Sequence, residues 1–591
     1  MSTLVSRYEA LKRRVGGNRE KTTFEFTFGT PREELHQITP PSAPIRRILA
    51  ELHYALQVSQ EARGAYDLPI CDALTTLEEA MDAESVLPRT ACMAAEQALL
   101  PLAEAAKRYE VICAAHAHID MNWMWGWQET VAATLSTFRT MLQLMREYPD
   151  FCFSQSQASV YQIVETYDPA LMPEIQQRIR EGRWEVTATA WVETDKNMPD
   201  TASLLQHIQQ TRDYLQTVWG IDPDSLQVDF SPDTFGHSAQ VPEINAFGNV
   251  PYYYHCRGDA TEQVLYRWQA PSGREVLVYR EPYWYNSGIT PDIGTGVIAL
   301  SKYSGGLQTG LIVYGVGDHG GGPTRRDVER ILEMQTWPIF PRIRFGTFHE
   351  YFHKAERVRE NLPIVRSELN PIFSGCYSTQ SRIKLGNRRA EAALLDAETF
   401  SALATLLCDA PYPRKSFTRA WQETLFTHFH DILTGSCVQE SREHAMGLFA
   451  DVLAVTGTAH ANALRTLSGL IDTRMLPEGA DIAASQSEGA GVGYGLAHYA
   501  GIPNPERGAG RIRAFHAFNP CPCAQHVPVE MTLWDWPHDL RRVQVTDGMG
   551  HALPFQLLDN EMQKYWDHHF FRVLVQTTLP ALGYATMVLD A

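Results

Sequence analysis

The feature that most constrains the fold is an alternation of short apolar runs with helix-like stretches, which begins at residue 109 and continues to the run GLIVYGVGD at about residue 318. Runs such as EVICAA, FCFSQ and GLIVYGVG are each followed by segments with helical spacing, for example TLSTFRTMLQLMRE. Strands that alternate with helices form a parallel sheet with helical crossovers, either open or closed into a barrel. In both arrangements ligands bind at the carboxyl ends of the strands. The sequence therefore predicts an α/β domain over residues 109–370.

The flanking regions have other patterns. Residues 1–108 are predicted to be mainly helical, and residues 371–474, with NRRAEAALLDAETFSALATLLC, predict a helical bundle. Residues 475–512 are rich in Gly, Ala and Pro and predict a linker. Residues 513–591 contain short strand-like runs, and we expect them to be the start of a truncated β domain.

Composition excludes several classes of partner. The formal net charge is −18, and an acidic surface disfavours nucleic acid as the main partner but not a neutral sugar. No run approaches the roughly 18 apolar residues that a membrane helix needs, and the charged start MSTLVSRYEALKRR lacks the apolar core of a secretory signal. The ten cysteines contain no CxxC pair. These features predict a cytoplasmic protein that binds neither nucleic acid nor membrane.

Histidines and acids gather in four segments. They are HID with His118 and Asp120, SPDTFGHSAQ with Asp233, YGVGDHGGGPT with Asp318 and His319, and THFHDILTG with His428, His430 and Asp431. Side chains two residues apart on a strand share a face, so His118 and Asp120 can converge on one cation. The fourth segment is expected to be helical.

Each segment has an ordinary explanation when taken alone. An H-x-D pattern occurs by chance, an Asp before Gly is usual in turns, and Gly236 is expected to permit a sharp turn. The loop GDHGGGPT lacks the GK[ST] ending of a phosphate loop. Together, however, two His and two Asp form a mixed N/O ligand set suited to zinc, or to cobalt or manganese in its place. Asp318 would add the second carboxylate that glycoside hydrolysis requires.

The motifs HIDMNW, DTFGHSAQVPEI, GVGDHGGGPT and FHDILTGS occur in the order seen in class II α-mannosidases, glycoside hydrolase family 38. WVETDKNMP and GCYSTQSRIKLGNRRAEAALLDAE also resemble the intracellular and bacterial branch of that family, and the resemblance covers roughly residues 110–590. It implies a retaining α-mannosidase with one Zn²⁺, for which Co²⁺ can substitute, acting on a mannoside or a mannose-containing oligosaccharide. It also implies a seven-stranded, parallel, barrel-like α/β catalytic domain, followed by a helical bundle and β domains.

The same resemblance implies the roles of individual residues. The zinc ligands would be His118, Asp120, Asp233 and His430; Asp233 would also be the nucleophile, and Asp318 the general acid/base. Trp123, Arg257 and Asp431 would contact the substrate, whereas Trp125 and Trp127 are expected to be core residues. Sliding the alignment by one residue would put His319 at the acid/base position, but a carboxyl group at 318 fits the two-carboxylate mechanism.

Several alternatives stay open at this point. Family members usually continue for several hundred residues, so the chain is expected to be a truncated product, a shortened form, or one half of a split enzyme whose β domain a separate chain supplies; a homo-oligomer is also compatible. Another zinc-dependent hydrolase, such as a deacetylase, would use metal-bound water as the nucleophile. An inactive chain that binds mannosides would keep the metal site without the acid/base function.

Overall fold

A computed structural model describes most of the chain. The described residues are 2–15, 19–25, 31–37, 42–84, 86–258, 261–317, 319–370, 373–476, 512–534, 536, 538–565 and 568–590. Asp318 and residues 477–511 of the expected linker lie outside them. The chain divides into two compact units, Met1–Glu391 with Trp421–Asp451, and Ala392–Ala420 with Val452–Ala591.

The first unit begins with helices. They are α1 (Ser2–Val15), α2 (Ala43–Glu61), α3 (Asp67–Ala83), α4 (Arg89–Leu99) and α5 (Ala103–Ala106). Their apolar stripes are buried against one another, as at Leu11, Leu52 and Leu74. The sequence did not predict the antiparallel pair β1 (Arg19–Glu25) and β2 (Pro31–Gln37) in this region.

Seven short apolar runs of the α/β part form strands, among them EVICAA, FCFSQ and GLIVYGVG. They are β3 (Glu110–Ala115), β4 (Phe153–Gln155), β5 (Trp184–Val186), β6 (Val228–Ser231), β7 (Tyr252–His255), β9 (Glu275–Arg280) and β10 (Thr309–Tyr314). Three more were not expected, namely β8 (Leu265–Gln269), β11 (Arg342–Phe345) and β12 (Ile364–Val365). The ladders among the described residues run in the orders β10-β3-β11, β4-β5 and β12-β8-β9-β7-β6. The region is therefore mixed α/β, as predicted.

The expectation of an entirely parallel sheet is wrong at one pair. β8 runs antiparallel to β9, whereas the other pairs in these three ladders are parallel. A tight turn, in which Ala270 N donates to Arg274 O and Gly273 has a φ of +91°, joins the two strands. A connection this short can join only antiparallel neighbours, since parallel strands need a crossover of a dozen residues or more.

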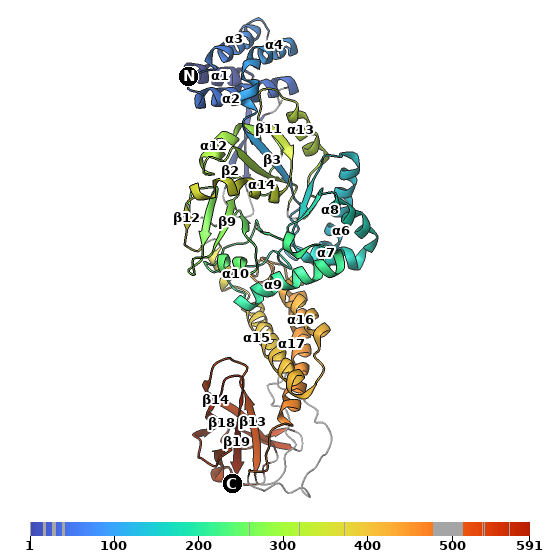
Figure 1. The fold of residues 1–591 in the computed structure, drawn as a ribbon, viewed down its shortest axis with the longest axis vertical. Helices are drawn as coiled ribbons and strands as arrows, with labels where there is room; N and C mark the ends of the chain where they lie inside the picture. Colours follow the sequence, from blue (N-terminus) through green and yellow to red (C-terminus); the bar gives the residue numbers. More distant parts are fainter. Residues whose placement is uncertain are drawn as a thin grey trace. The chain divides into compact units, whose positions relative to one another are not determined.

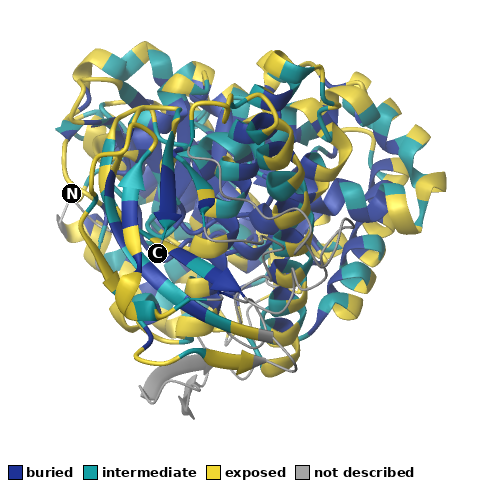
Figure 2. Cartoon of the chain, turned by 90° about the horizontal axis from the view of Figure 1, so that it is seen from below, coloured by how far each residue is buried: buried dark blue, intermediate teal, exposed yellow. Residues whose placement is uncertain are grey.

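Helices cover these strands (Figure 1). They are α6 (Trp127–Glu147), α7 (Ala158–Tyr167), α8 (Met172–Arg180), α9 (Thr201–Tyr214), α10 (Val241–Phe247), α11 (Asp292–Thr295), α12 (Val297–Lys302), α13 (Arg325–Gln335) and α14 (Phe348–Ala355). Buried residues concentrate on the strands and on the inward faces of the helices (Figure 2). One core cluster joins β3, β6, β9 and β10 through Ile112, Val228, Leu277 and Leu311. This packing fixes the strand ends that carry the site.

Three long helices follow, and each contributes residues to both units. They are α15 (Ser381–Cys408), α16 (Arg414–Thr427) and α17 (Gln439–Ser468). Within the second unit, Phe400 and Ala404 of α15 pack with Ala463 and Leu467 of α17. No helix among the described residues is long and apolar enough to cross a membrane.

The second unit ends in antiparallel β structure. Its strands are β13 (Arg513–Phe518), β14 (Gln525–Trp534), β15 (Gln544–Asp547), β16 (Phe555–Leu557), β17 (Gln563–Tyr565), β18 (His568–Leu579) and β19 (Tyr584–Asp590). They pair in the orders β13-β19-β15 and β14-β18-β16, with β17 also on β18. Leu533, Phe571, Val573 and Leu589 belong to one core cluster that joins the two sheets. The helical region is thus followed by a β region, as expected.

Candidate metal centre

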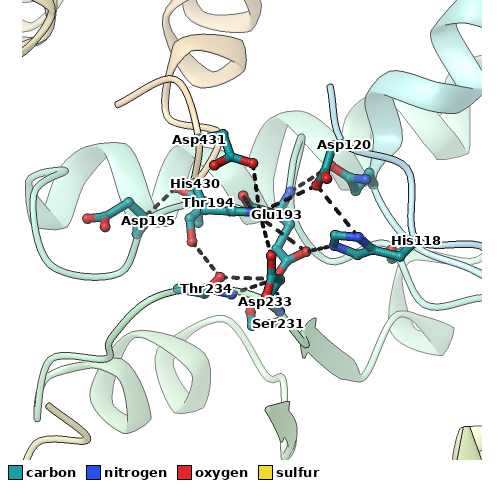
Figure 3. A network of polar contacts seen from close by, with 12 residues as sticks. His118, Asp120, Glu193, Thr194, Asp195, Ser231, Asp233, Thr234, His430 and Asp431 are labelled. Carbon is teal, nitrogen blue, oxygen red and sulfur yellow. Dashed lines mark hydrogen bonds and ion pairs between the residues drawn. The ribbon is translucent and has the colours of Figure 1, made fainter. Parts of the chain in front are cut away.

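Chain segments that lie far apart in the sequence bring the predicted ligands together (Figure 3). His118 and Asp120 follow β3, Asp233 follows β6, and His430 lies just beyond α16. All four belong to the first unit. Their side chains are buried, with exposed fractions of 1% for His118, 3% for Asp120, 12% for Asp233 and 0% for His430. Of the four, Asp233 is therefore the one that solvent reaches most.

His430 Nε2 is the point on which the carboxylates converge. It lies 3.5 Å from Asp120 Oδ1, 3.4 Å from Asp233 Oδ2 and 3.5 Å from Asp431 Oδ2. His118 Nδ1 lies 3.6 Å from the same Asp120 oxygen. Two imidazoles and two carboxylates thus face one small volume, and a third carboxylate, that of Asp431, lies beside it.

The unsatisfied atoms of this cluster show that its residues fit a metal ion. Among the described residues, His118 Nδ1, Asp120 Oδ1 and His430 Nε2 are buried without a hydrogen-bond partner. A buried polar atom without a partner is costly, and such atoms are rare in folded proteins. The donor atoms of Asp120, Asp233 and His430 lie within 4.8 Å of one another. Two nitrogens and two carboxylate oxygens form a set that suits zinc and related divalent ions.

The predicted helix around His430 is wrong. α16 ends at Thr427, because the backbone of the next residues pairs with the segment after β5 instead. Asp195 N donates to His428 O at 2.9 Å, and His430 N donates to Glu193 O at 3.1 Å. These bonds replace the i−4 bonds of a helix, and they hold the His430 ring over the ends of the strands.

Glu193 is a member of the cluster that the sequence motifs did not single out. Its side chain is 1% exposed, and Oε2 lies 2.7 Å from His118 Nε2. Its Oε1 accepts the backbone N–H of Asp233 at 2.6 Å and that of Thr234 at 2.8 Å. The available signal was its place in WVETDKNMP, at the end of the segment that begins with the apolar strand β5.

The charges of the cluster depend on one another. Burial alone would lower the pKa of His118, but the carboxylates of Asp120 and Glu193 outweigh it and raise the pKa to about 9. The pKa of His430 is raised for the same reason, with Glu193 and Asp431 as the main acids. Burial alone would raise the pKa of Asp233, but the His430 ring, 3.4 Å from Oδ2, and the charge of Arg257 hold it well below its usual range. Without a metal, protons on the two rings balance the carboxylates.

Arg257 lies on the other side of Asp233. Its Nη2 and Nε both contact Asp233 Oδ1, so the two oxygens of Asp233 face different partners. The guanidinium carbon lies 5.1 Å from the ring centres of both Trp284 and Phe373. These two rings are 42% and 54% exposed, and they border the site at the surface.

The glycine-rich loop after β10 lies against the His118 loop. Gly320 N donates to His118 O at 3.1 Å, and His319 forms a backbone bridge with Ile119. Gly320, Gly321 and Gly322 have φ angles of +78°, +86° and +60°, which explains the run of glycines. The side chain of His319 is exposed and lies edge-to-face on Trp125.

Trp123 and Trp127 are half-buried. Trp123 packs edge-to-face on Trp125, and its carbonyl accepts Val438 N at 2.8 Å. Trp127 packs on Phe426.

The carboxylate of Asp431 is held by a hydrogen bond that the Ser436 hydroxyl donates to Oδ1, so that Oδ2 faces His430.

Gly236 is needed for a different reason than the one predicted. It does not have a positive φ, so the turn itself does not require glycine. A Cβ at this position would collide with Asn370 Oδ1, and it would lie 2.9 Å from Tyr377 OH and 3.0 Å from Asn197 Nδ2. A side chain at this position, three residues after Asp233, would therefore have to displace these side-chain ends.

Fold and geometry define an α/β protein with a candidate metal centre built from histidines and carboxylates beyond the strand ends. Residues 108–371 match the N-terminal domain of the family 38 glycosyl hydrolases. Residues 371–467 match the alpha mannosidase middle domain. The chain belongs to glycoside hydrolase family 38.

Curated relatives agree with this membership. Alpha-mannosidase 2C1 of Homo sapiens is 29% identical over 360 residues, which cover 59% of this chain and 34% of the relative. Alpha-mannosidase G of Dictyostelium discoideum is 28% identical over 373 residues, covering 60% of this chain and 33% of the relative. The matched regions thus span about a third of the length of these relatives. The crystal structure of an alpha-mannosidase from Enterococcus faecalis V583 has the same fold, with a TM-score of 0.62, 19% identity, and coverage of 82% of this chain and 56% of that one.

Proposed function

We propose that the chain hydrolyses terminal, non-reducing α-D-mannosyl residues of mannosides or mannose-containing oligosaccharides, with retention of anomeric configuration and with Zn²⁺ as its cofactor. The observation that carries the proposal is the setting of Asp233. One of its oxygens faces the histidine–aspartate cluster, and the other contacts Arg257. An ionised carboxylate held at the most accessible side of a buried metal centre is suited to attack a sugar. Family membership and the names of the relatives support the same reaction.

Each residue of the cluster has a part in the proposed reaction. His118, Asp120, Asp233 and His430 would hold the cation, which when bound would act as a Lewis acid toward sugar hydroxyls. Asp233 attacks the anomeric carbon and forms a covalent glycosyl-enzyme, while the leaving oxygen takes a proton from Asp318. Asp318 then deprotonates the water that releases the sugar.

The environment of the glycine-rich loop supports Asp318 in the acid/base role. The residues on either side of it belong to the loop that Gly320 joins to the His118 carbonyl. His319, the alternative acid/base, faces Trp125 and is exposed. In a retaining enzyme the carboxyl groups of Asp233 and Asp318 would lie about 5–5.5 Å apart. Trp123, Arg257 and Asp431 complete the proposed sugar site.

The proposal also includes the domain boundaries and the barrel-like form of the catalytic domain. We place the catalytic domain at residues 109–370, in a seven-stranded barrel-like form, followed by the bundle at 371–474, the linker and the β domain. Backbone bridges between His116 and Ser154 and between Ser287 and Tyr314 support the barrel, because they link the segment after β3 to β4 and the segment after β9 to β10. A cytoplasmic location, and partners other than the sugar, remain predictions.

The direct test is release of nitrophenol from a nitrophenyl α-mannoside by the purified chain, with and without a strong chelator. We expect chelation to abolish the activity, and zinc or cobalt to restore it. Activity indifferent to the chelator would refute the metal assignment. Metal-loaded protein that binds mannosides without hydrolysing them would favour the inactive or split chain.

A second experiment separates the proposal from a deacetylase-like hydrolase. A fluorinated mannosyl fluoride that slows the second step should leave a covalent sugar on the peptide containing Asp233, detectable by mass spectrometry. An enzyme that uses metal-bound water as its nucleophile forms no such adduct. Asp233→Ala should abolish the label.

A further inference from the structure

We infer that Glu193 is the positioning residue of the metal centre, a single carboxylate that orients both histidine ligands and the backbone of the nucleophile. The inference rests on the proposed function, because it concerns the same site. Glu193 lies in the segment after β5, and its carboxylate reaches three of the chain segments that supply ligands (Figure 3). Its position is fixed in turn, since Glu193 N donates to Gln157 Oε1 at 2.9 Å.

The contact with His118 determines which ring nitrogen can bind a metal. His118 Nε2 lies 2.7 Å from Glu193 Oε2, and a carboxylate can only accept a hydrogen bond. Nε2 therefore carries the hydrogen, and in the neutral ring Nδ1 has the free lone pair. Nδ1 is the atom that faces Asp120 and has no hydrogen-bond partner among the described residues. Glu193 thus points the lone pair of His118 into the cluster.

The same residue orients His430 through the opposite nitrogen. His430 Nδ1 lies 3.4 Å from Glu193 O and 3.7 Å from Glu193 Oε2, and both atoms are acceptors. The hydrogen therefore belongs on Nδ1, and the lone pair on Nε2 faces Asp120 and Asp233. One residue consequently sets the tautomers of two ligands, one in the loop after β3 and one in the turn after α16.

The second carboxylate oxygen holds the loop of the nucleophile. Glu193 Oε1 accepts from the backbone N–H groups of Asp233 and Thr234 and from the Thr234 hydroxyl, the last at 3.2 Å. Acceptors of this kind around metal ligands fix ligand orientation, and replacing them weakens metal binding. Glu193 couples this loop to both histidines.

An alternative arrangement would make Glu193 itself a ligand. Its oxygen, His118 and His430 offer donor atoms within 4.8 Å of one another. A metal bound by both Glu193 Oε2 and His118 Nε2 would break the 2.7 Å contact between these two atoms. It would also leave the three unpartnered atoms of the cluster without a function. The geometry favours a metal on the far side of both rings from Glu193.

The test is the variant Glu193→Gln, measured by zinc and cobalt affinity in competition with a chelator of known affinity. If the amide oxygen keeps the backbone contacts of Oε1, the amide NH₂ faces the N–H of His118, so two donors oppose each other. We expect metal affinity to fall on the order of 10–100-fold. The visible absorption bands of the cobalt-loaded protein should shift as well, which a purely structural loss would not cause.

A matched control is available in β5. Glu185 is also buried, and it accepts from the His349 ring at 2.6 Å and from the backbone N–H groups of Phe348 and His349. No contact joins it to the proposed ligands in the described part of the chain. Glu185→Gln should leave metal affinity and the cobalt spectrum unchanged. Thermal unfolding of both variants without metal would show their cost to the fold.

A crystal structure of the zinc-loaded wild-type protein provides a test that does not depend on the variant folding. We expect His118 Nδ1 and His430 Nε2 at about 2.0–2.1 Å from the zinc, with the Glu193 oxygens outside the coordination sphere. Zinc bound by His118 Nε2 or by Glu193 would overturn the inference, as would a Glu193→Gln variant with wild-type affinity and spectrum. Wild-type protein that binds no metal would refute this inference together with the proposed cofactor. Metal binding without mannoside hydrolysis would refute the proposed function alone.

Discussion

Arg257 contacts Asp233 through two nitrogens, Nε and Nη2, which both lie against the single oxygen Oδ1. The arginine is also fixed at its backbone, because its carbonyl accepts from His237 Nε2 at 3.0 Å and from His255 Nδ1 at 2.8 Å. With both ends held, Arg257 determines which oxygen of Asp233 remains available to the cluster. The orientation of the proposed nucleophile therefore depends on a residue that we do not expect to bind the metal.

Arg257→Lys should consequently reduce catalysis more than metal binding. Lysine has one ammonium group and cannot reproduce the two-nitrogen contact. A hydrogen bond to a charged group contributes about 1.5–3 kcal/mol, so we expect kcat/KM to fall on the order of 10–100-fold. Metal content, measured by mass spectrometry, should stay at the wild-type level. Arg325→Lys, at an exposed pair with Glu147, is the control and should have no effect. An unchanged kcat/KM in Arg257→Lys would contradict the role.

Metal binding should release protons. The raised pKa values of His118, about 9, and of His430 mean that both rings are protonated near neutral pH when no metal is bound. Each histidine needs a free ring nitrogen to bind the metal, so each ring must lose one proton. We therefore expect release of about two protons per metal ion at pH 7, and a metal affinity that falls as the pH falls. Calorimetry in buffers of different ionisation enthalpy measures this number. His430→Asn should release about one proton fewer, and a wild-type value of zero would contradict the charge state.

The buried carboxyl group of Glu281 should make the free energy of unfolding depend on pH. Burial raises its pKa to about 7 from the ordinary 4.5, although Tyr254 OH and Tyr283 N donate to it. Between these two values the folded state keeps a proton that the unfolded state has lost. This contribution to stability is therefore present below pH 4.5, and it is lost as the pH rises toward 7.

Glu281→Gln isolates this effect. Relative to the wild type, the variant should gain about 3 kcal/mol of unfolding free energy between pH 4 and pH 8, since one pKa unit corresponds to about 1.4 kcal/mol. Denaturant titrations at several pH values measure the difference. Glu333→Gln, at an exposed position on α13, is the control and should follow the wild-type curve. Parallel curves for Glu281→Gln and the wild type would show that Glu281 does not titrate in this range.

The sequence was informative where a functional residue directly follows an apolar strand. His118, Asp120 and Asp233 could be located in this way, because the strand ends of an α/β domain face one region. The non-helical position of His430 could not, since it depends on backbone bonds to Glu193 and Asp195, more than 200 residues earlier. Helical spacing is a local property, and it does not report such tertiary pairing.

The role of Glu193 could not be predicted from the sequence, for a related reason. A glutamate in a loop is usually solvent-exposed, and only the folded structure shows that this one reaches two histidines and two backbone N–H groups. The antiparallel strand β8 was not predicted as a separate strand, because LYRWQ is short and has the same strand-like residue pattern as the strands around it. The deciding contacts of Glu193 are long-range, and composition and periodicity do not contain them.

Gly236→Ala tests whether close packing near Asp233 matters for the site. The added Cβ would meet the Asn370 amide, which accepts from Asn197 Nδ2 at 3.2 Å, so the methyl group must displace a hydrogen-bonded pair. Overpacking of this kind costs about 1–3 kcal/mol of stability. Because Asp233 lies three residues earlier on the same loop, metal affinity should fall as well.

Gly288→Ala is the matched control for this prediction. Apart from its two chain neighbours, no described residue lies within 4 Å of a Cβ at Gly288, and its φ is not positive. A substitution at such a position usually changes stability by less than about 0.5 kcal/mol. The free energy of unfolding and the zinc affinity should therefore drop together in Gly236→Ala and stay unchanged in Gly288→Ala. A loss of stability without a loss of affinity would show that the Asp233 loop can adjust independently of its packing against Asn197 and Asn370.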